Sequence, residues 1–536
     1  MHPQNMQESI RLVEETRAAR ILGAPGRMSA EAKDALLKKF HPDYQDDAFG
    51  EILVGPNKGQ KAPAELCEAL HSKSMVSALA EGAPDFGFDF DVDVLTIGGG
   101  GAGASAAIEA RHAGASVLIA TKLRMGDANS MMAEGGIQAA DKENDSPAQH
   151  YLDAYGGGHF AAKPELLKRL VLDGPGAIDW LLGLGVLFDK ESDGTMLTTH
   201  GGGTSRKRMH ACADYTGAEI MRVLRDEVKC LGIPVVEYMS AIELLKDETG
   251  LAAGAVLRNM LTGELQFARA KTVVLATGGA GRMHYRGFPT SNHYGATADG
   301  LVLAYRAGAK LLYQETLQYH PTGVAYPAQL FGALVTEKVR ALGAMLCNAE
   351  GSAFVHPLET RDVACAAVMR ECSERGLGVK TESGLGVWLD SPMIDIIHGE
   401  GHTEKSLPGM LRMFLNYGID MRKEPILVYP TLHYQNGGIE IEAEGNTEAV
   451  GNLYVAGEAV GGIHGRNRLM GNSLLDIIVF GRLAGRNAAA LSKTMRPGQA
   501  SLAHVREYEN ELGAAGISTG KTSPVLLPDY ARKVAG

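Results

Sequence analysis

The sequence contains few cysteines, and none of them stands in a metal-binding pattern. The six cysteines are widely separated, at positions 67, 212, 230, 347, 365 and 372. They form no CxxC pair, no CxxCH motif and no close set of four. This argues against an iron–sulfur cluster, a c-type haem or a structural zinc held by this chain. We expect the thiols to be reduced and buried.

Long hydrophobic runs and an excess of basic residues are missing as well. No segment is apolar over the roughly 20 residues that a helix needs to cross a bilayer, and the N-terminus lacks the apolar core of a signal peptide. The net charge is −11, so we expect no nucleic-acid-binding face. These absences predict a cytoplasmic protein with no direct membrane span, or one held at the inner face of a membrane through partners.

What the chain does have is length and a regular alternation of patterns. Its 536 residues suit two or three domains with a large core. Residues 29–40 predict a capped helix and residues 64–82 a second one, but residues 1–90 carry no recognisable chemistry. Further along, apolar strands alternate with amphipathic helices, which predicts an α/β fold with a layered sheet.

The segment DVLTIGGGGAGASAAIEARHAGASVLIATK, residues 93–122, predicts a strand, a glycine turn, a helix and a second strand. Gly98, Gly100 and Gly103 have the GxGxxG spacing, which allows a tight turn, close approach to a pyrophosphate and close helix–strand packing. A purely structural turn is the alternative. The second strand ends at Lys122, not at the acidic residue of an NAD site, and another glycine cluster lies within residues 273–282. We therefore expect a long dinucleotide crossing the sheet.

Ten motifs in a fixed order carry a resemblance to a known family. They are IGGGGAG, MAEGGIQAA, ATGGAGR, TADG, QYHPTG, TEKVRALGA, TRD, TLHYQNGGI, LYVAGE and HGRNRLMGNSLLD. Over residues 91–490 the chain resembles the flavoprotein subunits of succinate dehydrogenase and fumarate reductase, together with their relative L-aspartate oxidase. The resemblance implies an FAD-dependent oxidoreductase in which a Rossmann-like FAD-binding domain is split by an α+β capping domain.

The implied organisation has five segments, with an N-terminal extension and a short C-terminal tail around the family's own domains. They are the extension (1–90), the first segment of the FAD-binding domain (91–315), the capping domain (316–431), the second segment of the FAD-binding domain (432–490) and the tail (491–536). The family's respiratory subunits carry a larger helical domain after the FAD-binding region. We therefore expect the extension to replace some of its contacts, including contact with a partner.

By this resemblance, FAD binds on the glycine turns and beside residues near its isoalloxazine ring. The residues carried over are Gly98, Gly100, Ala102, Gly103, Lys122, Asn129, Ser130, Gly135, Gly136, Asp299, Glu458, Ser473 and Leu474. In membrane-bound relatives, a histidine five residues before the glutamate of AEGG bonds covalently to FAD, and this chain has Asn129 there. We expect noncovalent FAD, which in the family accompanies poor succinate oxidation and favours the fumarate-reducing direction.

The resemblance also implies two anchors for a C4 dicarboxylate such as fumarate or succinate. Arg468 and His433 would bind one carboxylate, and His320 and Thr336 would bind the other. A guanidinium suits this task because its planar donors bind a carboxylate in a bidentate way. Gripping both carboxylates with fixed donors would also stabilise the enolate charge that develops during reduction.

The implied acid is Arg361, which would protonate one alkene carbon while flavin N5 delivers a hydride to the other. Arginine is an unusual acid because its free pKa exceeds about 12. Glu337 and Arg340, three residues apart on one helical face, would return the proton to Arg361. A surface ion pair is the alternative for that spacing.

Several points stay open at the level of sequence. The resemblance implies electron transfer from an iron–sulfur subunit within a multisubunit complex, while L-aspartate oxidase and a noncatalytic flavin relay are rival functions. The loop between His320 and Thr336 is longer than in the family, so access or docking could differ. Arg466 has no assigned role, and neither do the histidines outside the motifs, among them His159.

Overall fold

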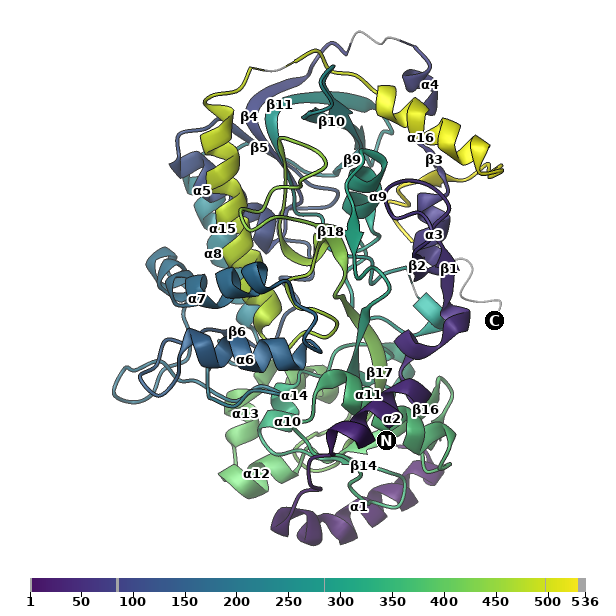
Figure 1. The fold of residues 1–536 in the computed structure, drawn as a ribbon. Coiled ribbons are helices and arrows are strands. Elements are labelled where there is room, and N and C mark those ends of the chain that lie inside the picture. Colours follow the sequence, from purple (N-terminus) through teal and green to yellow (C-terminus); the bar gives the residue numbers. More distant parts are fainter. Residues whose placement is uncertain (1, 83–85, 284, 497, 529–536) are drawn as a thin grey trace.

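A computed structural model describes residues 2–82, 86–283, 285–496 and 498–528 of the chain. Two sheets organise the molecule, a seven-stranded one in the upper lobe of Figure 1 and a five-stranded one in the lower lobe. The predicted α/β class is confirmed. None of the helices in these described ranges has the length and apolarity that a membrane crossing requires.

The seven-stranded sheet has the order β8-β5-β4-β11-β10-β9, with β19 also pairing with β11. Its strands are β4 (Phe90–Ile97), β5 (Val117–Ala120), β8 (Val235–Val236), β9 (Met239–Lys246), β10 (Ala252–Asn259), β11 (Leu265–Leu275) and β19 (Leu453–Val455). Strands β8, β5, β4, β11 and β19 pair in parallel, whereas β9 and β10 are antiparallel additions. The last four residues of β4 and of β11, and all four of β5, are buried and mostly Val, Leu and Ile, as strand segments covered on both faces should be.

Helices α5 (Gly101–His112) and α15 (Asn472–Ser492) pack together against this sheet (Figure 1). They meet at small residues: a Cβ added to Gly485 would lie 2.0 Å from the carbonyl oxygen of Ala106. The other elements of this lobe are α6 (Pro147–Gly157), α7 (Pro164–Leu184), α8 (Thr216–Cys230), α9 (Asp299–Arg306), β6 (Ile137–Gln138), β7 (Met209–His210), β12 (Leu311–Leu312), β18 (Gly438–Glu440) and β20 (Val460–Gly461).

The lower lobe is an antiparallel sheet of order β13-β17-β16-β14, with β15 beside β16. Its elements are β13 (Leu317–Val324), α10 (Lys338–Ala341), β14 (Leu346–Cys347), α11 (Arg361–Ser373), β15 (Val379–Thr381), β16 (Gly384–Leu389), α12 (Met393–His398), α13 (His402–Ser406), α14 (Pro408–Leu415) and β17 (Ile426–Gln435). The core under α11 contains Val363, Ala366 and Val387. We call this lobe the cap.

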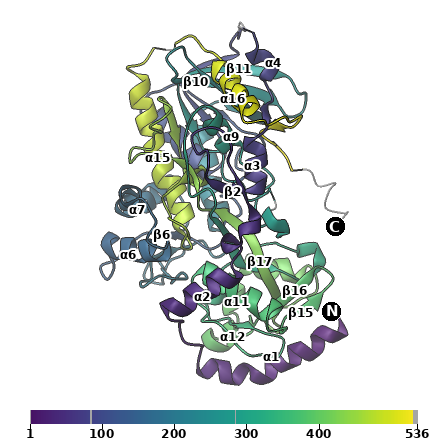
Figure 2. The same ribbon diagram turned by 45° about the vertical axis from the view of Figure 1, so that its right-hand side comes forward.

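The N-terminal segment runs over both lobes (Figure 2). Its elements are α1 (Gln4–Leu22), α2 (Ala30–Phe40), β1 (Phe49–Glu51), β2 (Lys61–Pro63), α3 (Ala64–Leu70), β3 (Lys73–Ser74) and α4 (Ser77–Ala80). Helix α1 packs on the cap around Trp388, and Leu36 of α2 joins the cap core. Leu66 of α3 belongs to the core of the upper lobe. The segment is thus built into its own chain, and the expected partner contact stays a prediction.

Two expectations for this segment have different outcomes. The capped helix at 29–40 is confirmed as α2, with Ser29 Oγ accepting a hydrogen bond from the amide of Ala32. The single helix expected at 64–82 is wrong, because the chain breaks into α3, β3 and α4. Strand β3 pairs in parallel with β21 (Thr522–Ser523), which follows α16 (Ala503–Ala514), and Ser74 donates a hydrogen bond to the buried Glu243. These tertiary bonds outweigh the weak helix preference of serine.

Candidate active site

A cavity of about 670 Å³ lies where the carboxyl ends of β4, β5, β11 and β19 face the cap. Ligands bind at this edge of parallel sheets because the loops that follow the strands converge there. Residues of the glycine turn line one side of the cavity, and the motif residues of the cap line another. The site therefore lies between the two lobes.

The glycine turn has the geometry that a dinucleotide site requires. Gly98 has a φ of +124°, and a Cβ there would lie 2.1 Å from the carbonyl oxygen of Ala276. A Cβ on Gly103 would lie 1.9 Å from the carbonyl oxygen of Gly98, so this glycine permits packing and does not line the cavity. Gly100 precedes α5 without a side-chain cap. The amide of Gly101, the first residue of α5, donates to Ser130 Oγ at 3.1 Å. Backbone amides at a helix N-terminus suit phosphate oxygens.

The other residues expected to bind FAD lie along the same cavity. They are Gly98, Gly100, Ala102, Lys122, Asn129, Ser130, Gly135, Gly136, Asp299, Glu458, Ser473 and Leu474. Lys122 Nζ pairs with Asp299 and donates to Thr297 Oγ1 at 2.8 Å. Among the described residues, Glu134 Oε2 and Thr277 Oγ1 line the cavity region without a hydrogen-bond partner. Buried groups without partners, beside a glycine cradle, fit a polar ligand such as FAD.

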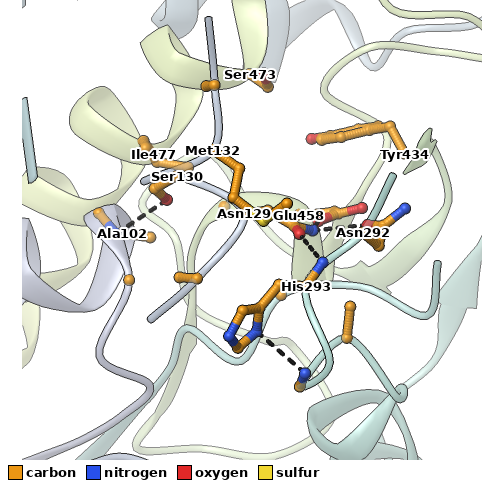
Figure 3. A pocket seen from close by; sticks show the side chains of 18 of the residues that line it. Ala102, Asn129, Ser130, Met132, Asn292, His293, Tyr434, Glu458, Ser473 and Ile477 are labelled. Carbon is orange, nitrogen blue, oxygen red and sulfur yellow. Dashed lines mark hydrogen bonds between the residues drawn. The ribbon is translucent and has the colours of Figure 1, made fainter. Parts of the chain in front are cut away.

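Asn129 is held in a polar network rather than pointing freely into the cavity (Figure 3). Its Nδ2 donates to Asn292 Oδ1 at 2.7 Å and to Glu458 Oε2 at 3.1 Å, and its Oδ1 accepts the His293 amide at 2.7 Å. Burial raises the pKa of Glu458. An amide side chain cannot form the covalent bond that a histidine forms with a flavin in some relatives.

Two buried arginines that line the cavity meet at one side-chain carbonyl behind it. Arg361, the first residue of α11, donates from Nη1 to Gln318 Oε1 at 3.0 Å. Arg468 donates from Nη2 to the same oxygen at 3.0 Å and from Nη1 to Ser473 Oγ at 3.0 Å. Burial and the charge of Arg361 lower the pKa of Arg468 to about 10. Both guanidiniums therefore line a site that attracts anions.

Glu337 is the carboxylate between two of the arginines. Its Oε2 lies 2.8 Å from Arg361 Nε and 3.3 Å from Arg340 Nη2, and its Oε1 accepts the amide of Gly202 at 2.6 Å. Burial alone would raise its pKa, but the charges of Arg361 and Arg340 hold that pKa below its ordinary value. Arg340 is buried behind Glu337 and donates to the carbonyl of Pro357 at 2.7 Å; it does not line the cavity.

The two motif histidines lie side by side on neighbouring strands. The ring centroids of His320 on β13 and His433 on β17 are 5.1 Å apart, and both side chains line the cavity with Thr336. Burial and the nearby arginine charges lower the pKa of each histidine well below 6.5. His433 Nδ1 bonds with Ser291 Oγ at 2.8 Å. The histidines are therefore neutral near pH 7 and can act as hydrogen-bond donors.

Sequence reasoning missed Gln318 although it stands in the quoted motif QYHPTG. Residues two apart on a strand point to the same face, so Gln318 could have been placed beside His320 on β13. It also missed Tyr434, whose ring lies 4.2 Å from the guanidinium of Arg468 and whose hydroxyl donates to Asp476 at 3.0 Å. No local pattern indicates that contact, because Asp476 comes from α15.

These features define an α/β protein with a dinucleotide cradle and an anion site between two lobes. The FAD binding domain family matches residues 93–474. A fumarate reductase (CoM/CoB) chain of Methanothermobacter marburgensis is 39% identical over 79% of this chain and 76% of its own length. L-aspartate oxidase of Streptomyces coelicolor is 36% identical over 72% of this chain and 66% of its own length. The solved structure of an Escherichia coli quinol fumarate reductase variant aligns with a TM-score of 0.70, at 31% identity, over 79% of this chain and 74% of that chain.

The chain belongs to the FAD-binding flavoprotein family of fumarate reductase, succinate dehydrogenase and L-aspartate oxidase. It is an FAD-dependent oxidoreductase of the fumarate reductase and succinate dehydrogenase type. The predicted family and the predicted cofactor are both confirmed.

Proposed function

We propose that the site reduces a C4 alkene dicarboxylate, fumarate being the test substrate, and that this direction is favoured over succinate oxidation. The observation that carries the proposal is that Arg361 and Arg468, which both bond to Gln318 Oε1, line one cavity with the neutral His320 and His433. Arg468 contacts no carboxylate among the described residues, so a ligand carboxylate would balance its charge. Thr336 and His320 would hold the second carboxylate.

The division of labour follows from the contacts. When bound, FAD supplies a hydride to one alkene carbon. Arg361 would donate a proton from its guanidinium to the neighbouring carbon, and Glu337, 2.8 Å from Arg361 Nε, would return a proton to it. Arg340 would supply that proton to Glu337 across 3.3 Å and would regain one from solvent, so that each turnover consumes one solvent proton. The product then carries two new C–H bonds, one from the hydride and one from the guanidinium.

The cofactor and domain assignments complete this proposal. FAD would bind noncovalently, because Asn129 is engaged by Asn292, Glu458 and the amide of His293. The FAD-binding domain would comprise residues 91–315 and 432–490, with residues 316–431 as a cap that closes over the substrate and excludes water. Electrons would come from a separate iron–sulfur protein of the same complex, an idea supported by relatives whose names describe subunits.

The first test follows the flavin without air. The purified flavoprotein is reduced, mixed with fumarate and monitored by flavin absorbance. Rapid reoxidation in the native protein that is lost in Arg361→Ala supports the proposal. Arg422→Ala is the matched control, because Arg422 is a cap arginine that pairs with Asp420 away from the cavity. A native protein that fumarate does not reoxidise overturns the proposal.

L-aspartate oxidase activity is the second candidate, favoured by the Streptomyces coelicolor relative. The same anchors would hold the two carboxylates of aspartate while its Cα–N bond is oxidised to an imine. Aerobic incubation with aspartate, with hydrogen peroxide as the measured product, separates the two functions. A noncatalytic flavin relay would show neither activity while retaining FAD.

A further inference from the structure

A second cavity, of about 290 Å³, lies behind the active site where the lobes and the N-terminal segment meet. Gln318 and Asn467 line it, and Gln318 is also the residue that joins Arg361 and Arg468. The N-terminal segment contributes Asp43, whose Oδ2 accepts the amide of Leu317 at the start of β13 at 3.1 Å. Three separate regions of the chain therefore converge just behind the proposed acid.

One ionisable pair in this cavity connects the two lobes. His159 follows α6 in the upper lobe, and its Nε2 lies 2.7 Å from Oδ2 of Asp362 in the cap. Asp362 is the second residue of α11 and directly follows Arg361. It is buried, whereas the side chain of His159 is 37% exposed. The histidine is thus the more solvent-accessible partner of the pair.

The backbone around His159 is held in an unfavourable conformation. His159 has a φ of +59° and Phe160 a φ of +56°, and neither is a glycine. A left-handed conformation is unfavourable at non-glycine residues, and it persists where the surroundings impose it. The amide of Arg466 bonds to the carbonyl of Gly158 at 3.0 Å, which anchors the loop to the upper lobe. The loop therefore presents the imidazole to the cap at a conformational cost.

We propose that His159 is a positioning residue that latches the first turn of α11 to the upper lobe through Asp362 and thereby sets Arg361 at the substrate. The effect of this latch on catalysis rests on the proposed function of Arg361. The His159–Asp362 contact itself does not depend on that function. Opening the cap would break the His159–Asp362 pair. Closing the cap would form this pair and would at the same time bring Arg361 to the substrate. The exposed His159 would make that closure sensitive to pH.

The direction of this pH dependence follows from the charges that face the pair. The hydrogen bond and charge of Asp362 raise the pKa of His159, whereas burial and Arg466 oppose the rise. Burial would raise the pKa of Asp362, but His159 and Thr360 lower it, with a smaller contribution from His41. The carboxylates of Asp43 and Glu315 line the same cavity. The charged pair therefore holds from mildly acidic pH up to the raised pKa of His159 and weakens above it.

The test measures hydrogen exchange of the full-length holoprotein at the backbone amides of residues 364–367, from pH 6 to pH 9, corrected for intrinsic exchange. A charge-assisted hydrogen bond predicts roughly ten-fold slower exchange at pH 6 in the native protein than in His159→Gln. The difference should shrink toward pH 9, where the imidazole is neutral. Asp362→Asn should lose the same pH dependence. His112→Gln is the matched control, since His112 is an exposed histidine near Glu227, away from the cap.

Activity adds a second readout. If fumarate reoxidises the native flavin, His159→Gln should slow that step about ten-fold while the Kd for fumarate changes little, because the carboxylate anchors remain. Exchange that is equal in the native protein and His159→Gln at pH 6 overturns the latch. If the variants do not fold, the native protein alone is decisive. Corrected hydrogen-exchange rates of residues 364–367 that do not change between pH 6 and pH 9 would overturn the latch. If fumarate does not reoxidise the flavin, the proposed function is refuted. The latch is then judged by the hydrogen-exchange result alone.

Discussion

At the scale of single residues, excess positive charge governs the site. Arg340 and Arg361 both contact Glu337, so one carboxylate serves two guanidiniums, and Arg468 has only neutral partners among the hydrogen bonds described above. Buried charges need partners, and here a dianionic ligand would supply them. Gln318, as a neutral acceptor, holds Arg361 and Arg468 together without cancelling their charge.

The charge of Glu337 is testable on its own. Glu337→Gln keeps the shape of the side chain but removes the proton acceptor between Arg340 and Arg361. We therefore expect the reoxidation of the flavin by fumarate to slow by about a hundred-fold or more. Flavin content should be unchanged. Glu359→Gln is the matched control, because Glu359 is a buried glutamate that pairs with Lys33 outside the cavity. Equal losses in the two variants would contradict the relay.

At the scale of elements, close backbone approach determines where the cofactor can bind. Strand β4 ends at a glycine turn whose backbone lies against the end of β11, and α5 begins directly over it. A side chain at Gly98 or Gly103 would overlap a backbone carbonyl oxygen of the turn or of the segment after β11. The fold thus depends on glycine at a few positions and tolerates substitution at others.

Two glycine substitutions separate these cases. Gly98→Ala would place a Cβ 2.1 Å from the carbonyl oxygen of Ala276, at a φ of +124°, so we expect purified protein without FAD or with a disrupted sheet. Gly176→Ala lies in α7 with nothing within 4 Å, and should stabilise the helix by about 0.5–1 kcal/mol. Flavin absorbance per protein and thermal unfolding measure both. Full FAD occupancy in Gly98→Ala would refute the assignment of the turn.

At the scale of the whole molecule, the N-terminal segment ties the lobes together. Arg17 and Arg20 of α1 both bind Asp390, which is completely buried in the cap. The indole of Trp388 donates to Ser9 Oγ at 2.8 Å. Further along, Asn57 bonds to the carbonyl of Leu311 in the upper lobe. The segment therefore restrains how far the cap can move from the FAD-binding lobe.

Removing one tie should weaken the cap measurably. Arg20→Ala leaves Asp390 with a single partner, and breaking a buried ion pair costs about 3–5 kcal/mol. Urea unfolding followed by Trp388 fluorescence, in a Trp180→Phe background, reports on the cap. Arg11→Ala on the same helix removes an exposed pair with Glu15 and should cost less than about 1 kcal/mol. If Arg20→Ala and Arg11→Ala lower the free energy of unfolding by similar amounts, the ion pair with Asp390 does not hold the N-terminal segment to the cap.

Local patterns in the sequence were sufficient for the glycine turn and the strands around it, because each depends on a few neighbouring positions. The roles of the motif residues came from the family resemblance and stay predictions. Local patterns failed at residues 64–82, where Ser74 bonds to Glu243 and β3 pairs with β21. Tertiary pairing of this kind has no signature in a single segment. The same limit hid the contact between Tyr434 and Asp476.

The sequence by itself determined the α/β class, the FAD-binding family and the residue types of the site, since periodicity and motif order record these directly. Only the tertiary structure decided which charges meet. Arg361 and Arg468 reach one carbonyl, and His159 reaches Asp362, from elements far apart in the chain. The pKa values of such groups follow from burial and neighbouring charge, which exist only after the lobes have packed.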